Sequence, residues 1–298
     1  MNGTHTHLAG IIPLANLKTD YNLQTPDCLL PVDAGFTAIE KAVFECAVVG
    51  CQTIWIVAND DLAPLVREVV GEWVHDPAYY YRQHDPFPTS RQKAIPIYYV
   101  PIHPKDRDRR DSYGWSILHG VYSAWRIANI ISHWVIPDKY YVSFPMSIHN
   151  VYSLRKYRRQ ISEISKNWFL TYEGKSVKDN LPLPFTMGGE DYIQCRRHVN
   201  HLTTKEFVNP PPGELPSQKL PFVERWSARS FDFATIFEKI NEEGAYRQET
   251  EWFYDLSTWE GYQTFLGSEN YIKKPAKGLT KARLDVKLPY REGELNDD

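Results

Sequence analysis

The segment around residue 255 carries the residues with the clearest chemical potential. Asp255 follows an aromatic stretch that suits a short strand, and Ser257, Thr258 and Glu260 come directly after it. Mg²⁺ prefers oxygen ligands and takes one or two carboxylates together with phosphate oxygens and water, and Mn²⁺ accepts similar ligands. We therefore predict that Asp255 holds a divalent cation beside phosphates. The alternative is a helix N-cap, because aspartate is common at the start of helices.

Other polar residues stand where strands are expected to end. Asn59 and Asp60 follow the apolar run Thr53–Ala58, and Arg110 lies in a run of alternating charges that begins at Asp106. Nucleotides bind beyond the carboxyl ends of parallel strands, and arginine binds phosphate through two parallel hydrogen bonds. Asn59 and Asp60 are predicted to contact a base or ribose, with helix capping as the alternative. Arg110 is predicted to reach a phosphate, with a solvated loop as the alternative.

Two glycine segments mark further candidates. Gly114 precedes a stretch with helical periodicity. Glu190 and Asp191 follow a Gly-Gly pair at 188–189, which suits a loop that binds sugar hydroxyls. A plain turn is the alternative for Glu190 and Asp191.

The alternation of strand and helix patterns predicts an α/β fold. Short apolar runs predict buried strands, and amphipathic stretches between them predict helices, one of which starts at Thr37 and ends at Gly50. This order implies a mainly parallel sheet with helices on both faces and functional groups at the carboxyl ends of its strands. The predicted strands are 8–13, 53–58, 95–102 and 139–144, and the predicted helices are 37–49, 62–73 and 114–131. The prolines of the strand at 95–102 suggest an edge or a strand start.

The pattern changes after about residue 150. Residues 168–172 and 176–177 predict a β-hairpin across a glycine-containing turn, and such hairpins commonly shape a substrate pocket. The last residues, 271–298, form a charged tail.

Composition restricts the class of protein. The chain has 298 residues, of which 42% are hydrophobic, so it can bury a large core without disulfides. A net charge of −3 gives no global attraction to polyanions, and four cysteines in apolar surroundings suit a reducing compartment. No apolar run of about 18 residues occurs. These features predict a cytoplasmic protein that does not enter a membrane.

Several segments together resemble the sugar-1-phosphate nucleotidyltransferases, such as glucose-1-phosphate thymidylyltransferase, which have a GT-A-like fold. Gly10-Ile-Ile and the later segment Thr25-Pro-Asp-Cys-Leu-Leu-Pro-Val32 are similar to the opening strand and a Thr-Pro-Lys-x-Leu-Leu-Pro-Val motif of that family. Residues 172–185 resemble the hairpin over the family's sugar site. Asp255-Leu-Ser-Thr-Trp-Glu260 resembles its Asp-x-Gly-Thr-Pro-Glu metal motif.

The resemblance implies one nucleotidyltransferase-like domain over residues 1–298, with a nucleotide-binding half (8–150) and a sugar or acceptor half (151–270). It implies catalytic roles for Lys18 and Asp255, with Asp255 as the ligand of Mg²⁺ or Mn²⁺. It also implies nucleotide contacts from Asn16, Asn59, Asp60, Gly114 and Arg110, and sugar contacts from Glu190, Asp191 and Glu260.

The sequence departs from the family at three functional positions. The loop after the first strand, residues 13–20, contains no glycine, whereas the family wraps a triphosphate with a glycine-rich loop. Asp27 stands in place of a phosphate-binding lysine, and Ser143-Phe-Pro-Met146 stands where the family's first metal-binding aspartate is expected. Lys18 is the remaining cation that can steady phosphates from this loop.

These departures leave three functions open. The first is a divergent sugar-1-phosphate nucleotidyltransferase that binds a nucleotide or nucleotide-sugar and a sugar phosphate, and makes an NDP-sugar. The second is a glycosyltransferase that moves a sugar from a nucleotide-sugar to a hydroxyl acceptor, with a modified nucleobase as one such acceptor. The third is a non-catalytic descendant that acts as a binding or assembly module. Nucleic acid enters only as an acceptor, and a homo-oligomer is left open.

Overall fold

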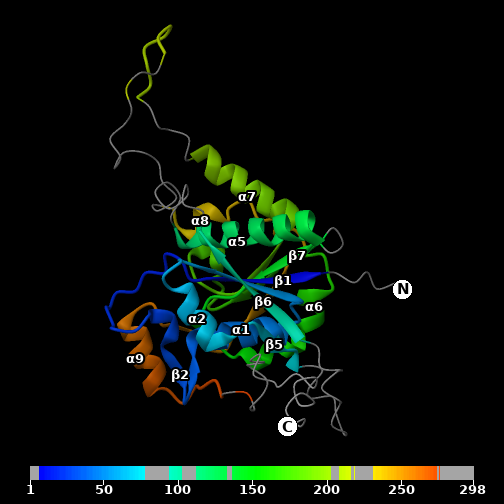
Figure 1. Cartoon of the computed structure of the whole chain (residues 1–298), viewed down its shortest axis with the longest axis vertical. Coiled ribbons are helices and arrows are strands. Elements are labelled where there is room, and N and C mark those ends of the chain that lie inside the picture. Colours follow the sequence, from blue (N-terminus) through cyan, green and yellow to red (C-terminus); the bar gives the residue numbers. More distant parts are fainter. Residues whose placement is uncertain are drawn as a thin grey trace, which may run out of the picture.

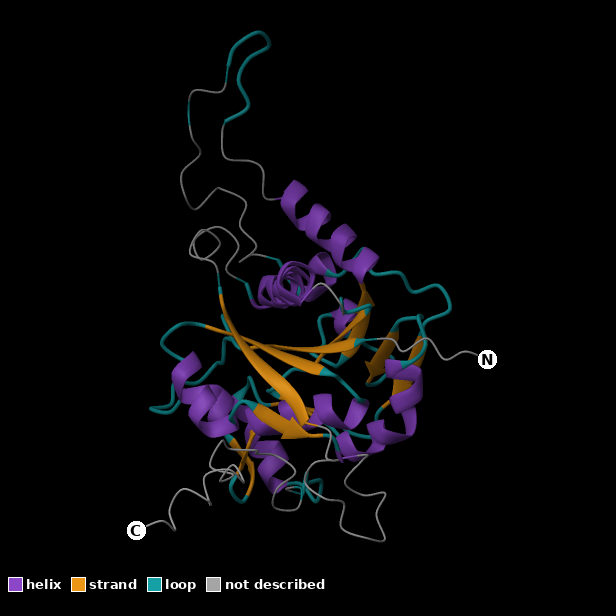
Figure 2. Ribbon diagram, turned by 45° about the vertical axis from the view of Figure 1, so that its right-hand side comes forward, coloured by secondary structure: helices purple, strands orange, loops and turns teal. Residues whose placement is uncertain are grey.

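A computed structural model describes residues 7–77, 94–102, 112–132, 136–202, 208–215, 218, 231–273 and 275. These residues form a central twisted sheet with helices on both faces, as Figures 1 and 2 show. The predicted fold class, a mixed but mainly parallel α/β sheet flanked by helices, is therefore confirmed.

The central sheet of the described residues has eight strands in the order β11-β9-β10-β7-β1-β4-β6-β5. Strands β10 and β5 run against their neighbours, and the remaining pairs are parallel. The strands of this sheet come from both predicted halves of the chain. They are β1 (Leu8–Pro13), β4 (Thr53–Ala58), β5 (Trp73–His75), β6 (Ala94–Pro101), β7 (Lys139–Val142), β9 (Trp168–Thr171), β10 (Phe185–Gly188) and β11 (Tyr246–Glu249).

Helices cover the two faces of this sheet separately. On one face lie α1 (Ala38–Val49), α2 (Ala63–Val70) and α6 (Arg158–Ser162), and on the other lie α5 (Tyr113–Ile127), α7 (Gly189–Leu202) and α8 (Phe233–Ile236). No helix in the described part of the chain is long and apolar enough to cross a membrane. The smaller elements are β2 (Pro31–Asp33), β3 (Phe36–Thr37), β8 (Ser147–Ile148), β12 (Tyr254–Asp255), α9 (Trp259–Gly267), a π-helical turn (Ala128–Ser132), and the 3₁₀ turns Asp27–Leu29, Val151–Tyr157 and Val177–Asp179.

Strand β1 shows why the sheet has two apolar faces. Its side chains alternate, so Leu8 and Ile12 pack under α1, whereas Ala9 and Ile11 pack under α5. Both sets are fully buried, which is why the strand reads as a continuous apolar run.

Helix α1 begins and ends where its sequence predicts. The Thr37 hydroxyl accepts a hydrogen bond from the Glu40 amide, and the Glu40 carboxylate accepts one from the Thr37 amide, which forms a capping box. Gly50 ends the helix at φ 95°, a left-handed conformation that favours glycine.

Of two strand predictions, one holds in part and one is wrong. Strand β6 lies between β4 and β5, but β5 pairs only with residues 94–96, and Pro96 stands near the start of β6, which was the other alternative for 95–102. Strand β9 pairs with β10 through Phe169 and Phe185, and not with the predicted residues 176–177. The turn at Tyr172–Lys175 does form, but Ser176 then starts a 3₁₀ turn that it caps with its own hydroxyl. The strand that pairs with β9 is therefore β10, later in the chain than predicted, and both strands belong to the central sheet.

A buried cation holds the turn that follows β7. The Lys41 ammonium of α1 is fully buried and donates to the carbonyl oxygens of Phe144 at 2.9 Å and Ser147 at 2.6 Å. It also pairs with the Glu45 carboxylate at 3.2 Å, which in turn accepts a hydrogen bond from the Tyr141 hydroxyl at 2.7 Å. Burial lowers the pKa of Lys41, while Glu45 acts in the opposite direction. Lys41 thus ties helix α1 to the end of β7.

We predict that Lys41→Met destabilises the protein by about 3–5 kcal/mol, because Glu45 is left buried without its partner and two carbonyls lose a charged donor. Urea unfolding monitored by circular dichroism measures this change. The double variant with Glu45→Leu should recover part of the loss. Lys175→Met, at an exposed turn, is the control and should change stability by less than about 0.5 kcal/mol. Equal effects of the two lysine substitutions would contradict the role of Lys41.

The same buried cluster predicts a pH dependence of stability. Burial lowers the pKa of His149 to about 4, although Glu45 at 3.5 Å opposes the shift and Lys41 adds to it. The unfolded chain takes up this proton near the ordinary pKa of 6.5. The contribution of neutral His149 to the free energy of unfolding is therefore complete above pH 6.5 and is lost as the pH falls from 6.5 to about 4. The expected loss from this group is about 3 kcal/mol. Unfolding at several pH values should show a shallower slope in His149→Gln than in the unchanged protein.

Candidate active site

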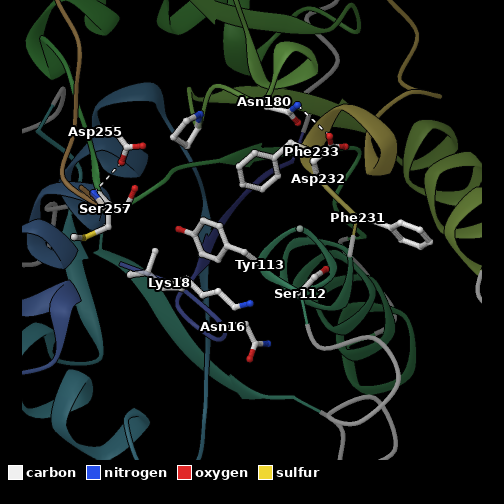
Figure 3. Close-up of a pocket in the computed structure, with 14 residues that line it drawn as sticks. Asn16, Lys18, Ser112, Tyr113, Asn180, Phe231, Asp232, Phe233, Asp255 and Ser257 are labelled. Atoms are coloured by element: carbon white, nitrogen blue, oxygen red, sulfur yellow. Dashed lines mark hydrogen bonds between the residues drawn. The ribbon is translucent and has the colours of Figure 1, made fainter. Parts of the chain in front are cut away.

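A cavity of about 310 Å³ opens at the carboxyl ends of the parallel strands. Four of the residues predicted from the sequence line it: Asn16, Lys18, Gly114 and Asp255 (Figure 3). They come from three distant parts of the chain, namely the loop after β1, the first turn of α5 and the end of β12. The volume lies at the lower end of the range for small-molecule sites.

Strand pairing places Asp255 at the cavity wall. Asp255 pairs with Ser147 in the β8–β12 ladder, and the Leu256 amide donates to the Met146 carbonyl at 2.8 Å. The side chain is half-buried, and its Oδ1 accepts a hydrogen bond from the Ser257 amide at 2.9 Å. The N-cap of α9 is Thr258, whose hydroxyl accepts from the Gly261 amide. The alternative prediction, that Asp255 is a helix N-cap, is therefore wrong.

Asn16 and Lys18 lie in the loop that leaves β1. Asn16 has φ 64°, a left-handed conformation that asparagine adopts more readily than most residues. Its Nδ2 is buried and finds no hydrogen-bond partner among the described residues. Lys18 is exposed at the rim, and Figure 3 shows it beside Asn16 and Tyr113. The loop thus contributes one amide and one ammonium group to the cavity.

The rest of this loop is attached to the Asp255 segment. Asp20 accepts a hydrogen bond from the Trp259 amide at 2.7 Å, and its own amide donates to the Ser257 carbonyl. Tyr21 donates to the Leu256 carbonyl. Asp27, which replaces the family's lysine, accepts a hydrogen bond from the Thr19 hydroxyl at 2.8 Å. The loop is therefore closed by its own acidic side chains, and Asp20 occupies the amino end of α9, where an anion is favourable.

The turn after β7 contributes no carboxylate. Ser143 is fully buried and its amide donates to Ile11, whereas Met146 is the residue of this turn that lines the cavity. Among the described residues, no three His, Cys, Asp or Glu side chains gather closely enough to hold a metal. A Mg²⁺ ion fits at Asp255 only if phosphate oxygens and water complete its coordination.

The cavity also contains residues for which the sequence predicted no ligand contact. They are Leu17, Ser112, Tyr113, Met146, Asn180, Pro182, Phe231, Asp232, Phe233 and Ser257. Ser112 is the N-cap of α5, since its hydroxyl accepts from the Trp115 amide at 3.1 Å. Serine is a common N-cap, so Ser112 was the signal in the sequence that the helix begins at Tyr113. A helix that begins there places Tyr113 at the carboxyl edge of the sheet.

Gly114 has a packing role beside its place in the cavity. A Cβ at this position would lie 2.5 Å from Cδ1 of Ile236, so glycine allows α8 to approach α5. Ser116, in the same turn, is fully buried and donates to the carbonyls of Ala15 and Ser112. These contacts connect the β1 loop to α5.

The remaining predicted residues that the structure describes do not line the cavity. Asn59 and Asp60 lie at the same edge of the sheet, where the Asn59 carbonyl accepts from the amides of Leu62 and Ala63 at the start of α2. Glu260 is exposed in the first turn of α9. Arg110 lies outside the described residues.

Glu190 and Asp191 lie at the opposite edge of the sheet. Strand β10 is antiparallel to β7, and its last residue, Gly188, pairs with Lys139 at the start of β7. Asp191 accepts hydrogen bonds from the amides of Gly188 and Asn241 and from the Asn167 side chain, which braces this edge. The structure therefore does not bring Glu190 and Asp191 together with Asp255.

Comparison with solved structures agrees with this fold. The chain is similar to a putative glucose-1-phosphate thymidylyltransferase from Bacillus anthracis in complex with sucrose, with a TM-score of 0.55 and 11% identity over 90% of this chain and 98% of that chain. It is also similar to a UDP-glucose pyrophosphorylase complexed with UDP-glucose, with a TM-score of 0.50 and 12% identity over 88% of this chain and 98% of that chain. No family model and no curated protein matches the sequence. The chain therefore has a nucleotidyltransferase-like fold, and identities this low show the fold alone.

Gly261 tests how firmly Asp255 is placed. A Cβ on Gly261 would lie 2.1 Å from the backbone carbonyl oxygen of Asp255, so Gly261→Ala must displace this segment. We expect the substitution to destabilise the protein by about 1–3 kcal/mol, as overpacking does. Gly267→Ala, in the same helix, meets nothing within 4 Å and is the matched control. Thermal unfolding of both variants measures the difference, and equal melting temperatures would contradict the close approach.

Proposed function

We propose that the cavity binds a nucleotide or nucleotide-sugar, with the diphosphate between Lys18 and Asp255. The observation that carries the proposal is the convergence of Asn16, Lys18, Gly114 and Asp255 on one cavity at the carboxyl edge of a nucleotidyltransferase-like sheet. The partly apolar wall made by Tyr113 and Phe233 suits a base or a sugar ring.

The charges of the cavity imply that a cation accompanies the ligand. Lys18 lines the cavity together with two carboxylates, Asp255 and Asp232, and the carboxylates of Asp20 and Asp27 lie in the adjoining loop. Phosphates placed here without further positive charge would be repelled. A Mg²⁺ or Mn²⁺ ion held by Asp255 and the diphosphate would offset this repulsion and supply the Lewis-acid chemistry of phosphoryl transfer.

The first candidate activity is a divergent sugar-1-phosphate nucleotidyltransferase. A phosphate oxygen of the sugar phosphate attacks the α-phosphorus of a nucleoside triphosphate, an NDP-sugar forms and pyrophosphate leaves. Lys18 and the cation at Asp255 would neutralise the charge that develops on the phosphates.

A glycosyltransferase is the second candidate, and the closed loop favours it. Asp27 accepts a hydrogen bond from the Thr19 hydroxyl, and Asp20 accepts one from the Trp259 amide. Ser143 is buried, so this chain has fewer groups to hold a triphosphate than the sugar-1-phosphate nucleotidyltransferases that it resembles. An acceptor hydroxyl that attacks the sugar needs only a diphosphate leaving group to be held. A modified nucleobase remains one candidate acceptor, and a binding module without catalysis is the outcome if neither reaction occurs.

Titration calorimetry with UDP-glucose and dTDP-glucose tests the proposed ligand. We expect binding that strengthens with MgCl₂, and a loss of tenfold or more in Lys18→Ala, because a charged hydrogen bond contributes about 1.5–3 kcal/mol. Asp255→Asn keeps an oxygen for the Ser257 amide but removes the charge, so it should abolish the Mg²⁺ dependence. Lys175→Ala, at an exposed turn, is the control for Lys18. The same calorimetry is then extended to a wider panel of nucleotides and nucleotide-sugars. The proposal is wrong if no member of this panel gives a heat of binding.

Product analysis separates the two activities. Pyrophosphate released from a nucleoside triphosphate and glucose-1-phosphate would select the nucleotidyltransferase. Release of UDP from UDP-glucose would select the glycosyltransferase. Binding without either product would leave a non-catalytic module.

A further inference from the structure

Tyr113 has an unusual position among the residues of the cavity. It is the first residue of α5, and the Ser112 cap fixes the start of this helix through the Trp115 amide. Its ring packs against Phe144 and Phe233, with ring centroids 5.9 and 5.8 Å away. These two rings and the capped start of the helix hold the Tyr113 ring, and no hydrogen bond from a described residue orients its hydroxyl.

The Tyr113 hydroxyl is buried and has no hydrogen-bond partner among the described residues. A buried hydroxyl without a partner costs about 1–3 kcal/mol, so native proteins rarely keep one. In Figure 3 this hydroxyl points toward the wall formed by Asp255 and Ser257. No hydrogen bond joins it to either of them in the described part of the chain.

Neighbouring polar groups on the other side of the cavity are already paired. Asp232 Oδ1 accepts from the Thr235 amide at 2.9 Å, and its Oδ2 accepts from Asn180 Nδ2 at 3.1 Å. Asn180 Oδ1 accepts from the Ala234 amide at 2.8 Å. These groups form the cap of α8, so Tyr113 is a better candidate for contact with a ligand.

We propose that Tyr113 binds the ligand directly, by donating its hydroxyl hydrogen to a non-bridging oxygen of the diphosphate held between Lys18 and Asp255. This inference rests on the proposed function and adds to it a residue that the sequence did not single out. Tyr113 is thus a specificity-determining residue that distinguishes diphosphate ligands from nucleosides.

The protonation state of Tyr113 agrees with a donor role. Burial, and then the negative charges of Asp255 and Cys28 in its thiolate form, raise the pKa of Tyr113 well above its ordinary value. The hydroxyl therefore stays protonated at neutral pH and remains neutral. A neutral donor can approach a phosphate oxygen near Asp255 without the loss of a proton, and hydrogen bonds to charged acceptors are stronger than neutral ones.

Tyr113→Phe tests this inference, with UDP-glucose, UDP and uridine as the probes in calorimetry. We expect about tenfold weaker binding of UDP-glucose and UDP and unchanged binding of uridine, which carries no phosphate. The melting temperature of the ligand-free variant should be equal to or higher than that of the unchanged protein, because the substitution removes an unpaired buried hydroxyl.

Tyr99→Phe is the matched control. Tyr99 lies on β6, outside the cavity, and its hydroxyl donates to the Gly71 carbonyl at 2.6 Å. This variant should lower the melting temperature and leave binding of all three probes unchanged. A purely structural tyrosine would behave in this way, so the opposite responses of the two variants separate a ligand contact from a packing role.

Each outcome decides one claim. Equal affinities of Tyr113→Phe and the unchanged protein for UDP-glucose and UDP would overturn the inference while the proposed function stands. Equal losses for UDP and uridine would also overturn it, because the contact would then lie outside the diphosphate. If the unchanged protein binds none of the probes and no nucleotide in the wider panel, the proposed function fails and this inference fails with it.

Discussion

The position of the candidate active site depends on the buried ammonium group of Lys41. It binds two carbonyl oxygens of the turn after β7, and Ser147 of that turn pairs with Asp255 in the β8–β12 ladder. Asp255 therefore takes its place through Lys41, a cation 214 residues earlier in the chain. A buried charge is stable here because Glu45 and two carbonyls replace its water. Tyr141 and His149 complete the same cluster, which links α1, β7 and the site.

A second set of contacts fixes the loop after β1. The loop after β1 is short of glycine and closes on the Asp255 segment through Asp20 and Tyr21. In this arrangement the Asp20 carboxylate accepts from the Trp259 amide at the amino end of α9, a position that also suits an anionic ligand. In the part of the chain that the structure describes, the cavity is lined by one lysine and two carboxylates, Asp232 and Asp255. Two neutral groups, Asn16 Nδ2 and the Tyr113 hydroxyl, have no hydrogen-bond partner among these residues. Under the proposed function, a diphosphate in this cavity would be held by neutral hydrogen bonds and by a cation bound with it, more than by cationic side chains.

Local signals in the sequence predicted local structure well. Thr37 and Gly50 bound α1 as predicted, because a capping box and a left-handed glycine act over a few residues. Asp255 was singled out at a strand end, whereas Asn16, Lys18 and Gly114 followed from the resemblance to the sugar-1-phosphate nucleotidyltransferases, and all four line the cavity. The pairing of β9 with β10 and the distance of Glu190 and Asp191 from the cavity were not predictable in the same way, since strand direction is set by distant partners.

The sequence by itself determined the fold class, the alternation of strands and helices, and the type of residue at each strand end, because periodicity and capping depend on near neighbours. Only the tertiary structure decided which of those residues share one cavity. Tyr113 faces the cavity because Ser112, Phe144 and Phe233 fix its ring, and Glu190 lies elsewhere because β10 runs against β7. These outcomes depend on contacts between residues far apart in the chain. Periodicity and capping signals depend only on near neighbours, so they carry no information about such contacts.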